Sequence, residues 1–313
     1  MTKISDFYIH TKPQDGEVGI EIETEGSFCP EINVNGWKTE DDGSLRGYEN
    51  AEYVLKKPVY RDAVRGALLK LSKMWKHHGA IFSPDCPRTG VHVHINCQEM
   101  SFTQLVNFYC LYIILEDLLI KYCGPLREGN LFCLRTRDAE YTIKRLLDVI
   151  NSGDWKLLTL EDIRYSSANL CALPKYGSLE FRALRGTTDV NEIQTWILIL
   201  LKLKDASLKF EKARNIISTF SQEGGGAFLY NILGEYSELV ECYNMDKLIR
   251  SGVRRIQQVA HTFVKEPVNK REIAHKALKG LNNPIFLDED MDMGQDIENV
   301  INKINLQHRN GEI

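Results

Sequence analysis

The sequence lacks several features that would assign the chain to a familiar class of protein. None of its eight cysteines stands in a Cys-x-x-Cys pair, which disfavours a cysteine-based zinc site and predicts reduced thiols. No Gly-x-x-x-x-Gly-Lys-Ser/Thr motif is present, so the chain has no P-loop. The net charge is only −4, which excludes a globally basic nucleic-acid-binding protein but leaves a local basic patch open.

Long uncharged apolar runs are absent as well. The N-terminal segment 1–6 has no apolar signal-peptide core. The longest apolar run, 108–120, is interrupted by Glu116 and Asp117. We therefore expect a cytoplasmic protein without a membrane span. With 313 residues, of which 43% are hydrophobic and 26% are charged, the chain is typical of a globular protein with a substantial core.

Three short strand-like segments, 18–24, 90–95 and 178–183, carry charged or imidazole side chains on every second residue. Alternate side chains of a β-strand point to the same face, so one face of such a sheet is apolar. Buried carboxylates need a compensating cation, and a set made mostly of carboxylates with an imidazole suits Mg²⁺ or Mn²⁺ better than Zn²⁺. The pattern therefore predicts a metal-binding face that displays Glu21, Glu23, His92, His94, Glu180 and Arg182.

The remaining pattern mixes helices and strands. A strand over 51–57 precedes a helix over 61–78, which we expect to end at Gly79. Ser101 and Gln104 form a capping-box pattern that opens a long apolar helix reaching about residue 122. Further predictions are a helix over 138–151, a strand pair over 164–173 and 177–184 joined by a turn at 175–177, and a helix that follows an N-cap at Asp189 and runs to 212.

The composition divides the chain near residue 220. Residues 1–220 predict an α+β domain, and residues 221–313 predict a helical C-terminal region of unknown role, with a linker at Gly224–Gly226. The acidic stretch 288–292 is interpreted as a solvated loop.

Five motifs occur in a fixed order, and together they resemble the amidoligase family, of the type often found in phages. This family is similar in motif order to the glutamine synthetase and γ-glutamate–cysteine ligase superfamily. The resemblance covers roughly residues 15–205. It rests on Gly-Ile-Glu-Ile-Glu (19–23), Asp-Gly-Ser (42–44), Ala-Glu-Tyr-Val-Leu-x-x-Pro (51–58), Gly-x-His-x-His (90–94) and Leu-Glu-Phe-Arg (179–182).

The resemblance implies an ATP-dependent carboxylate–amine ligase of the host cytoplasm, with a curved antiparallel sheet of glutamine-synthetase type flanked by helices. ATP and Mg²⁺ would lie across its acidic face, and a carboxylate would be activated as an acyl phosphate. The resemblance assigns Glu21, Asp42 and Glu52 to one metal, and Glu23, His92 and Glu180 to a second. It places Arg182 beside the γ-phosphate, Arg164 and Asn169 on a phosphate- or substrate-facing strand, and His94 beside a neighbouring ligand or the bound molecule.

Other interpretations stay open at this point. A His-x-His pair with a later Glu is also the ligand set of cupin-like metal-dependent oxygenases, and the fold could serve a non-catalytic nucleotide-binding module. Asp42-Gly43-Ser44 is by default a turn. Glu180 and Arg182 could form a plain surface ion pair, and Arg135 with Arg137 could clamp a phosphate or lie in a solvated loop. The oligomeric state and the substrates (amino acid, peptide or protein terminus, or modified nucleobase) are left open.

Overall fold

A seven-stranded antiparallel sheet forms the centre of the fold, which was obtained as a computed structural model. The structure describes residues 2–8, 15–33, 36–83, 86–139, 141–159 and 164–267. The predicted acidic loop at 288–292 lies outside them. The strands are arranged in the order β2-β3-β1-β5-β7-β6, with β4 paired to β1. They are β1 Val18–Phe28, β2 Trp37–Glu40, β3 Glu49–Leu55, β4 Ile81–Phe82, β5 Gly90–Asn96, β6 Ala168–Asn169 and β7 Ser178–Arg185.

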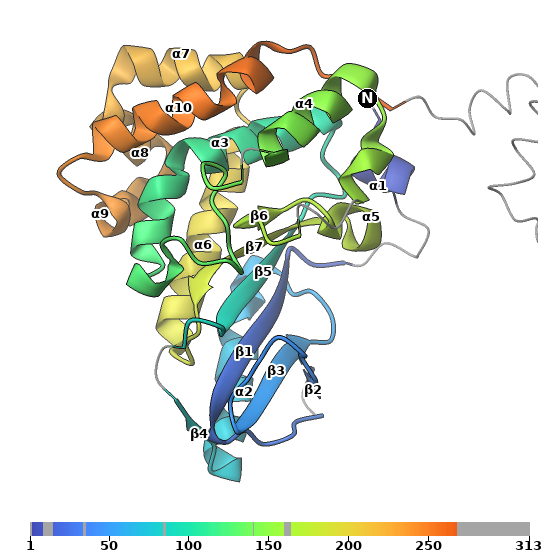
Figure 1. Ribbon diagram of the computed structural model, residues 1–313, viewed down its shortest axis with the longest axis vertical. Helices are drawn as coiled ribbons and strands as arrows, with labels where there is room; N and C mark the ends of the chain where they lie inside the picture. The colour runs from blue at the N-terminus through green and yellow to red at the C-terminus, as the bar shows by residue number, and fades with distance from the viewer. Residues whose placement is uncertain are drawn as a thin grey trace, which may run out of the picture. The chain divides into compact units, whose positions relative to one another are not determined.

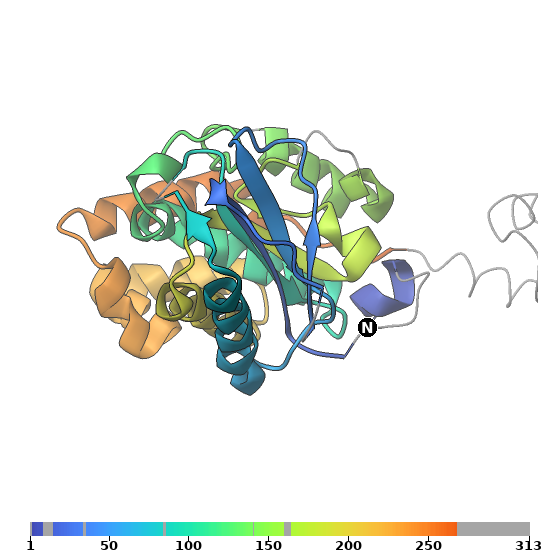
Figure 2. The same ribbon diagram turned by 90° about the horizontal axis from the view of Figure 1, so that it is seen from below.

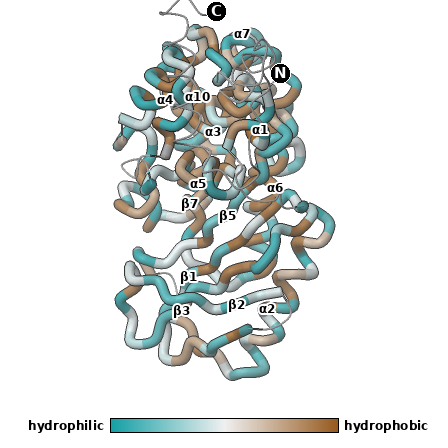
Figure 3. The backbone as a smooth tube through the Cα atoms, turned by 90° about the vertical axis from the view of Figure 1, so that its right-hand side faces the viewer, coloured by the Kyte–Doolittle hydropathy of each residue, from teal (hydrophilic) through white to brown (hydrophobic). Residues whose placement is uncertain are grey.

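The predicted alternation in β1 and β5 is present in the sheet. Ile20 and Ile22 of β1 are fully buried on the core face, and Val91 and Val93 of β5 lie beside them. The opposite face carries the acidic and imidazole side chains, so the register of the sheet determines which of them meet. Figure 3 shows hydrophobic segments along the central strands and the helices next to them.

Helices cover the apolar face of the sheet (Figures 1 and 2). Helix α3 (Phe102–Tyr122) begins at the predicted capping box, in which Ser101 and Gln104 satisfy one another's backbone N–H groups. Among the described residues, α3 is the helix long and apolar enough to cross a membrane, and 89% of its apolar window is buried inside the protein. Its aromatic side chains pack on β7, where the Tyr112 and Phe181 rings lie 4.9 Å apart. Helix α3 is therefore the central core helix.

Helix α2 (Val64–His78) packs beside β3 and ends, as predicted, at Gly79 in the left-handed conformation. The Trp75 ring meets Tyr53 of β3 edge to face at 5.2 Å. Trp37 of β2 donates its indole N–H to the Ala67 carbonyl. These contacts hold the outer strands of the sheet, and hence their acidic face, in a fixed position.

The helices after residue 212 pack on the helical layer. They are α7 (Ala213–Glu223), α8 (Gly225–Leu233), α9 (Ser237–Val240) and α10 (Met245–His261). Gly252 brings α10 against α3 so closely that an added Cβ would meet the Ile114 carbonyl at 2.4 Å. Residues up to Glu266 form one compact unit. Gly224 ends α7, and Gly225 and Gly226 begin α8. The separate role predicted for 221–313 stays a prediction.

The region around β6 differs from the sequence prediction. Strand β6 has only two residues, and helix α5 (Ala172–Tyr176) replaces the expected strand end and turn, with Gly177 as its left-handed cap. Helix α6 (Val190–Ser207) begins at the predicted N-cap Asp189 but ends five residues earlier than expected. The other helices are α1 (Ile4–Tyr8) and α4 (Tyr141–Ser152). The α+β class with an antiparallel sheet flanked by helices is confirmed.

Candidate metal and nucleotide site

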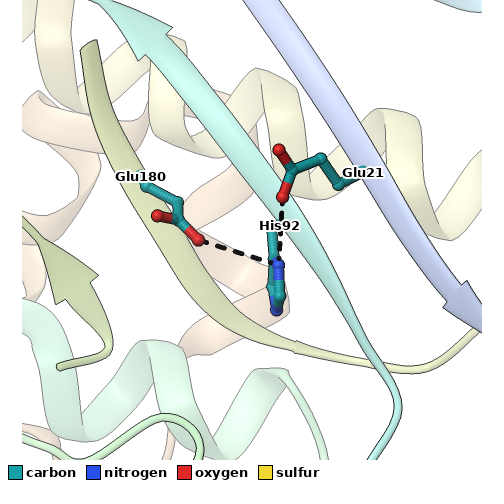
Figure 4. Close-up of side chains that lie close together, drawn as sticks. All are labelled: Glu21, His92 and Glu180. Atoms are coloured by element: carbon teal, nitrogen blue, oxygen red, sulfur yellow. Dashed lines mark hydrogen bonds and ion pairs between the residues drawn. The ribbon is translucent and has the colours of Figure 1, made fainter. Parts of the chain in front are cut away.

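Three adjacent strands bring Glu21, His92 and Glu180 together on the polar face of the sheet (Figure 4). The Nδ1 atom of His92 lies 3.3 Å from Glu21 Oε2 and 3.7 Å from Glu180 Oε1. One ligand atom from each of the three residues lies within 4.8 Å of the others, a spacing at which one cation can be shared. We call these residues the first ligand group.

A second ligand group shares His92 and contains Glu23 and Glu52. Glu23 and Glu52 face one another directly across β1 and β3. The other imidazole nitrogen of His92 lies 3.5 Å from Glu23 Oε1. Asp42 joins this group through a hydrogen bond with Glu23, while its own carboxylate accepts the Ser44 backbone N–H at 2.7 Å. Asp42 is therefore both a turn residue and a neighbour of the site.

The two groups exchange Glu21 and Glu23 relative to the sequence assignment. The resemblance placed Glu23 with His92 and Glu180, and Glu21 with Asp42 and Glu52. In the sheet, Glu21 is the direct partner of His92 across β1 and β5, whereas Glu23 is the direct partner of Glu52. Both carboxylates project from the same face of β1, so only the strand register could separate them.

Arg182 lies among the carboxylates, on the same face of β7 as Glu180, at a point where the strand contains a bulge. Val91 pairs with Leu184 and Val93 with Phe181, so two residues of β7 stand opposite the single residue His92. One of them is Arg182, whose guanidinium forms an ion pair with Glu180 and lies 3.4 Å from His92 Nδ1. The buried guanidinium of Arg182 therefore lies next to the first ligand group, at the bulge of β7.

The carboxylates of the second group repel one another. Burial, together with the nearby charges of Glu21, Glu23 and Asp42, raises the pKa of Glu52 to about 9. Burial also raises the pKa of Glu23, and its hydrogen bond with Asp42 adds to this effect. Without a cation, Glu52 therefore retains its proton at neutral pH.

The carboxylates of the first group are ionised by their neighbours. Burial acts to raise the pKa of Glu21, but the imidazoles of His94 and His92 outweigh it and hold the pKa well below its ordinary value. Burial opposes ionisation of Glu180 too, and Arg182 together with the two imidazoles lowers its pKa. The two groups thus differ in how completely the protein itself balances their charge.

Two other predicted residues adjoin the first group. The Asn169 side-chain amide donates to Glu180 Oε2 at 2.7 Å, and its oxygen accepts the Cys171 backbone N–H, so it orients Glu180. His94 lies with Nε2 3.3 Å from Glu21 Oε1 and with Nδ1 3.1 Å from the Ser178 hydroxyl. Both residues therefore hold the carboxylates in place.

Arg164 is not brought to the ligand groups. It is exposed, and its guanidinium lies over the Tyr165 ring at 6.0 Å. No hydrogen bond or ion pair links it to either ligand group in the described part of the chain. Its predicted contact with phosphate or substrate stays a prediction.

A cavity of about 420 Å³, which we call the lysine-lined cavity, opens beside the first group. Glu21 and His94 form its inner wall, and Lys38, Lys56 and Lys175 lie around it. Lys38 pairs with Glu40. Among the described residues, Lys56 and Lys175 have no carboxylate within ion-pair distance. The alternating pattern did not reveal these lysines, because they come from a strand end and from the unpredicted helix α5.

A second cavity of about 420 Å³, the threonine-lined cavity, opens at the other ligand group. Glu23 lines it, together with the hydroxyl side chains of Thr24, Ser83, Thr89, Thr187 and Thr188. Its arginine, Arg185, is already paired with Glu192 at 2.8 Å. Successive segments of β1 line the two cavities: residues 19–21 line the lysine-lined cavity, and residues 23–25 line the threonine-lined cavity. The ligand groups therefore lie between the two cavities.

A protein-family model described as "putative amidoligase enzyme" matches residues 17–204, more than half of the chain. The matched span contains all seven strands, both ligand groups and Arg182. No curated protein matches the chain.

Proposed function

The chain belongs to this amidoligase family, and we propose that it is an ATP- and Mg²⁺-dependent carboxylate–amine ligase. The observation that supports this proposal most strongly is the pair of ligand groups that share His92 on one sheet face. Five carboxylates converge there, and two of them, Glu23 and Glu52, have raised pKa values. Such a site is stabilised by divalent cations.

The donor set fits Mg²⁺ or Mn²⁺. It consists of carboxylate oxygens with a single shared imidazole, and hard divalent ions prefer oxygen ligands and fill their remaining positions with water or phosphate oxygens. When bound, the ion supplies charge neutralisation for phosphate oxygens. A cupin-like site would need both histidines as ligands, whereas His94 belongs to neither ligand group among the described residues.

The lysine-lined cavity suits the nucleotide. Lys56 and Lys175 offer positive charge to phosphates, and the cavity volume lies within the range of about 300–1,000 Å³ typical of small-molecule sites. Tyr176 adds an aromatic surface at the wall, with its ring 5.5 Å from that of His94. Glu21 connects this cavity to the first ligand group, where the transferring phosphate would lie.

The threonine-lined cavity suits the acceptor. Its arginine is paired with Glu192, so it offers no unpaired arginine or lysine to a triphosphate, while its hydroxyl groups can orient a small polar carboxylate or amine. Phosphoryl transfer requires the attacking and leaving oxygens to lie roughly in line. Two cavities at opposite ends of the ligand groups permit this arrangement. A substrate screen would identify the acceptor among amino acids, peptide or protein termini, and modified nucleobases.

The proposed reaction has two steps. In the first, a carboxylate oxygen of the acceptor attacks the γ-phosphorus, the bond to the β–γ bridging oxygen breaks, and ADP departs with the electron pair. In the second, the amine nitrogen attacks the acyl carbon, the carbon–oxygen bond breaks, and phosphate leaves with the electrons while the amine loses a proton. In this proposal Arg182 holds the γ-phosphate oxygens, which is supported by its position beside Glu180 and His92, and no side chain of the protein becomes covalently bound.

Calorimetric titration with Mg²⁺–ATP tests the proposal. We expect the wild type to bind Mg²⁺–ATP and Glu180→Gln to lose that binding, while the exposed control Glu99→Gln retains it. Lys56→Gln with Lys175→Gln should weaken binding, whereas Thr188→Trp should leave Mg²⁺–ATP affinity unchanged but block ADP formation with an acceptor. A wild-type protein that binds no Mg²⁺–ATP would refute the ligase assignment. A loss of nucleotide binding in Thr188→Trp would reverse the roles of the two cavities.

A further inference from the structure

Arg127 is a buried arginine, 1% exposed, that lies in the loop after α3. Among the described residues no carboxylate lies within ion-pair distance of it. Its guanidinium instead donates to three backbone carbonyls: Nε to Ala183 at 3.1 Å, Nη1 to Thr89 at 3.1 Å and Nη2 to Arg182 at 2.6 Å. A buried charge without a counter-ion is costly, so this arrangement points to a specific role.

The carbonyls that Arg127 binds belong to the β7 bulge and to the residue before β5. Arg182 and Ala183 are the two bulged residues opposite His92. A bulge leaves the ladder locally unpaired, and the planar fork of an arginine can bind several carbonyl oxygens at once in a fixed geometry. Arg127 therefore fixes the backbone from which the Arg182 side chain projects.

Gly90 explains why this contact is compatible with the ligand groups. A Cβ atom at Gly90 would lie 3.2 Å from Arg127 Nη2 and 3.4 Å from Glu23 Oε2. The missing side chain lets the guanidinium and the metal-site carboxylate approach the same point from two sides. The glycine of the Gly-x-His-x-His motif thus leaves room for both the Arg127 guanidinium and the Glu23 carboxylate.

We propose that Arg127 is a positioning residue that sets the Arg182 guanidinium against the γ-phosphate by holding the β7 bulge. This inference rests on the proposed function, because it concerns the phosphate contact of Arg182. The inference predicts that a substitution at Arg127 weakens recognition of the γ-phosphate and leaves the rest of the nucleotide site intact.

The experiment compares the affinities for Mg²⁺–ATP and Mg²⁺–ADP. The ratio of the two dissociation constants isolates the γ-phosphate contribution. We expect Arg127→Lys, Gly90→Ala and Arg182→Lys each to lower the preference for ATP by about tenfold to a hundredfold, the scale of a small misplacement at a reacting centre. The exposed control Arg65→Lys on α2 should keep the wild-type ratio. Gly90→Ala leaves the arginine in place and so tests the same contact if Arg127→Lys folds poorly.

A double-mutant comparison separates positioning from a merely structural role. If Arg127 acts through Arg182, the Arg127→Lys/Arg182→Lys protein should show no greater loss of ATP preference than Arg182→Lys alone. Equal losses of ATP and ADP affinity in Arg127→Lys and Gly90→Ala, or losses that multiply in the double variant, would overturn the inference. If the wild type bound neither nucleotide, the proposed function itself would fail. A wild-type preference for ATP that survives both substitutions would reject only the role of Arg127.

Discussion

Two regions of this protein bury several carboxylates, and they balance the charge in opposite ways. On α3, Asp117 lies 3.0 Å from the Arg255 guanidinium and within 4 Å of Arg135 and Arg137, and Glu116 accepts hydrogen bonds from Thr136 and Ser167. We call this the α3 charge cluster. On the sheet, five carboxylates share one arginine and two histidines.

The difference indicates which buried charges serve the fold and which serve a ligand. In the α3 charge cluster, three arginines supply the charge that compensates Asp117, while neutral hydroxyl and backbone donors hold Glu116, whose pKa is raised by burial. The arginines considered as a phosphate clamp, Arg135 and Arg137, are used there to bind Asp117 and Asp138. In the sheet, Glu23 and Asp42 share a hydrogen bond and Glu52 has a pKa of about 9. This contrast supports the proposal that the sheet site binds a divalent cation.

The largest expected effect is on catalysis by the sheet site. Arg182→Met removes the arginine proposed to face the transferring phosphate, so the rate of Mg²⁺–ATP-dependent ADP formation should fall by about 10³-fold. Circular dichroism would verify that the variant is folded. An unchanged rate would mean that the guanidinium serves only to balance Glu180.

A substitution in the α3 charge cluster should lower the stability of the fold. Asp117→Ala leaves the Arg255 guanidinium without its carboxylate partner, while Arg135 keeps Asp138, so the free energy of unfolding should fall by about 3–5 kcal/mol in urea titration. Glu52→Gln is the matched change in the sheet, and it should not destabilise the metal-free protein at neutral pH, because it replaces a protonated carboxyl group with a neutral amide of similar size. Equal losses in the two variants would contradict the contrast between the regions.

The pH dependence of stability sharpens the same contrast. The folded-state pKa of Glu52 is about 9, above its ordinary value of 4.5, so the folded protein holds this proton more tightly than the unfolded chain. Its contribution to stability is fully present below pH 4.5 and is lost as the pH rises through about 9. Thermal unfolding of the metal-free wild type should therefore shift to lower temperature across this window, and Glu52→Gln should flatten the curve. Identical pH profiles for the two proteins would rule out this explanation.

The smallest expected effect lies outside both regions. Ser101→Ala removes the side-chain acceptor of the α3 capping box and should lower the free energy of unfolding by about 1 kcal/mol. Affinity for Mg²⁺–ATP should be unchanged, because Ser101 belongs to neither ligand group and lines neither cavity. A large change in nucleotide affinity would show that α3 is coupled to the sheet site.

The sequence predicted the components of the site better than their arrangement. The period-two pattern identified Glu21, Glu23, His92 and Glu180 on one face, because alternation depends only on local strand geometry. The resemblance grouped Glu21 with Asp42 and Glu52, and Glu23 with His92 and Glu180. The sheet instead sets Glu21 beside His92 and Glu23 beside Glu52, because register depends on how β1 pairs with strands that come later in the chain. Ser101 and Gly79 were identified as helix boundaries since capping, too, is local.

Features that depend on contacts between distant segments could not be predicted from local sequence patterns. The β7 bulge adds one residue to a strand whose sequence alternates without a break, and Arg127 binds it from a loop more than 50 residues away. Helix α5 replaces a predicted turn, and the contact of Lys175 with the lysine-lined cavity follows from it. The interaction of Asp117 with three arginines likewise joins α3, a loop and α10.

Titration with Mn²⁺ followed by electron paramagnetic resonance tests the central claim most directly, because it reports cation binding without a known acceptor. The account predicts that the wild type and Asp117→Asn bind Mn²⁺, and that Glu21→Gln and Glu180→Gln lose this binding while remaining folded. A wild-type protein that binds no Mn²⁺ in the presence of ATP, or binding that survives both glutamine substitutions, would contradict it.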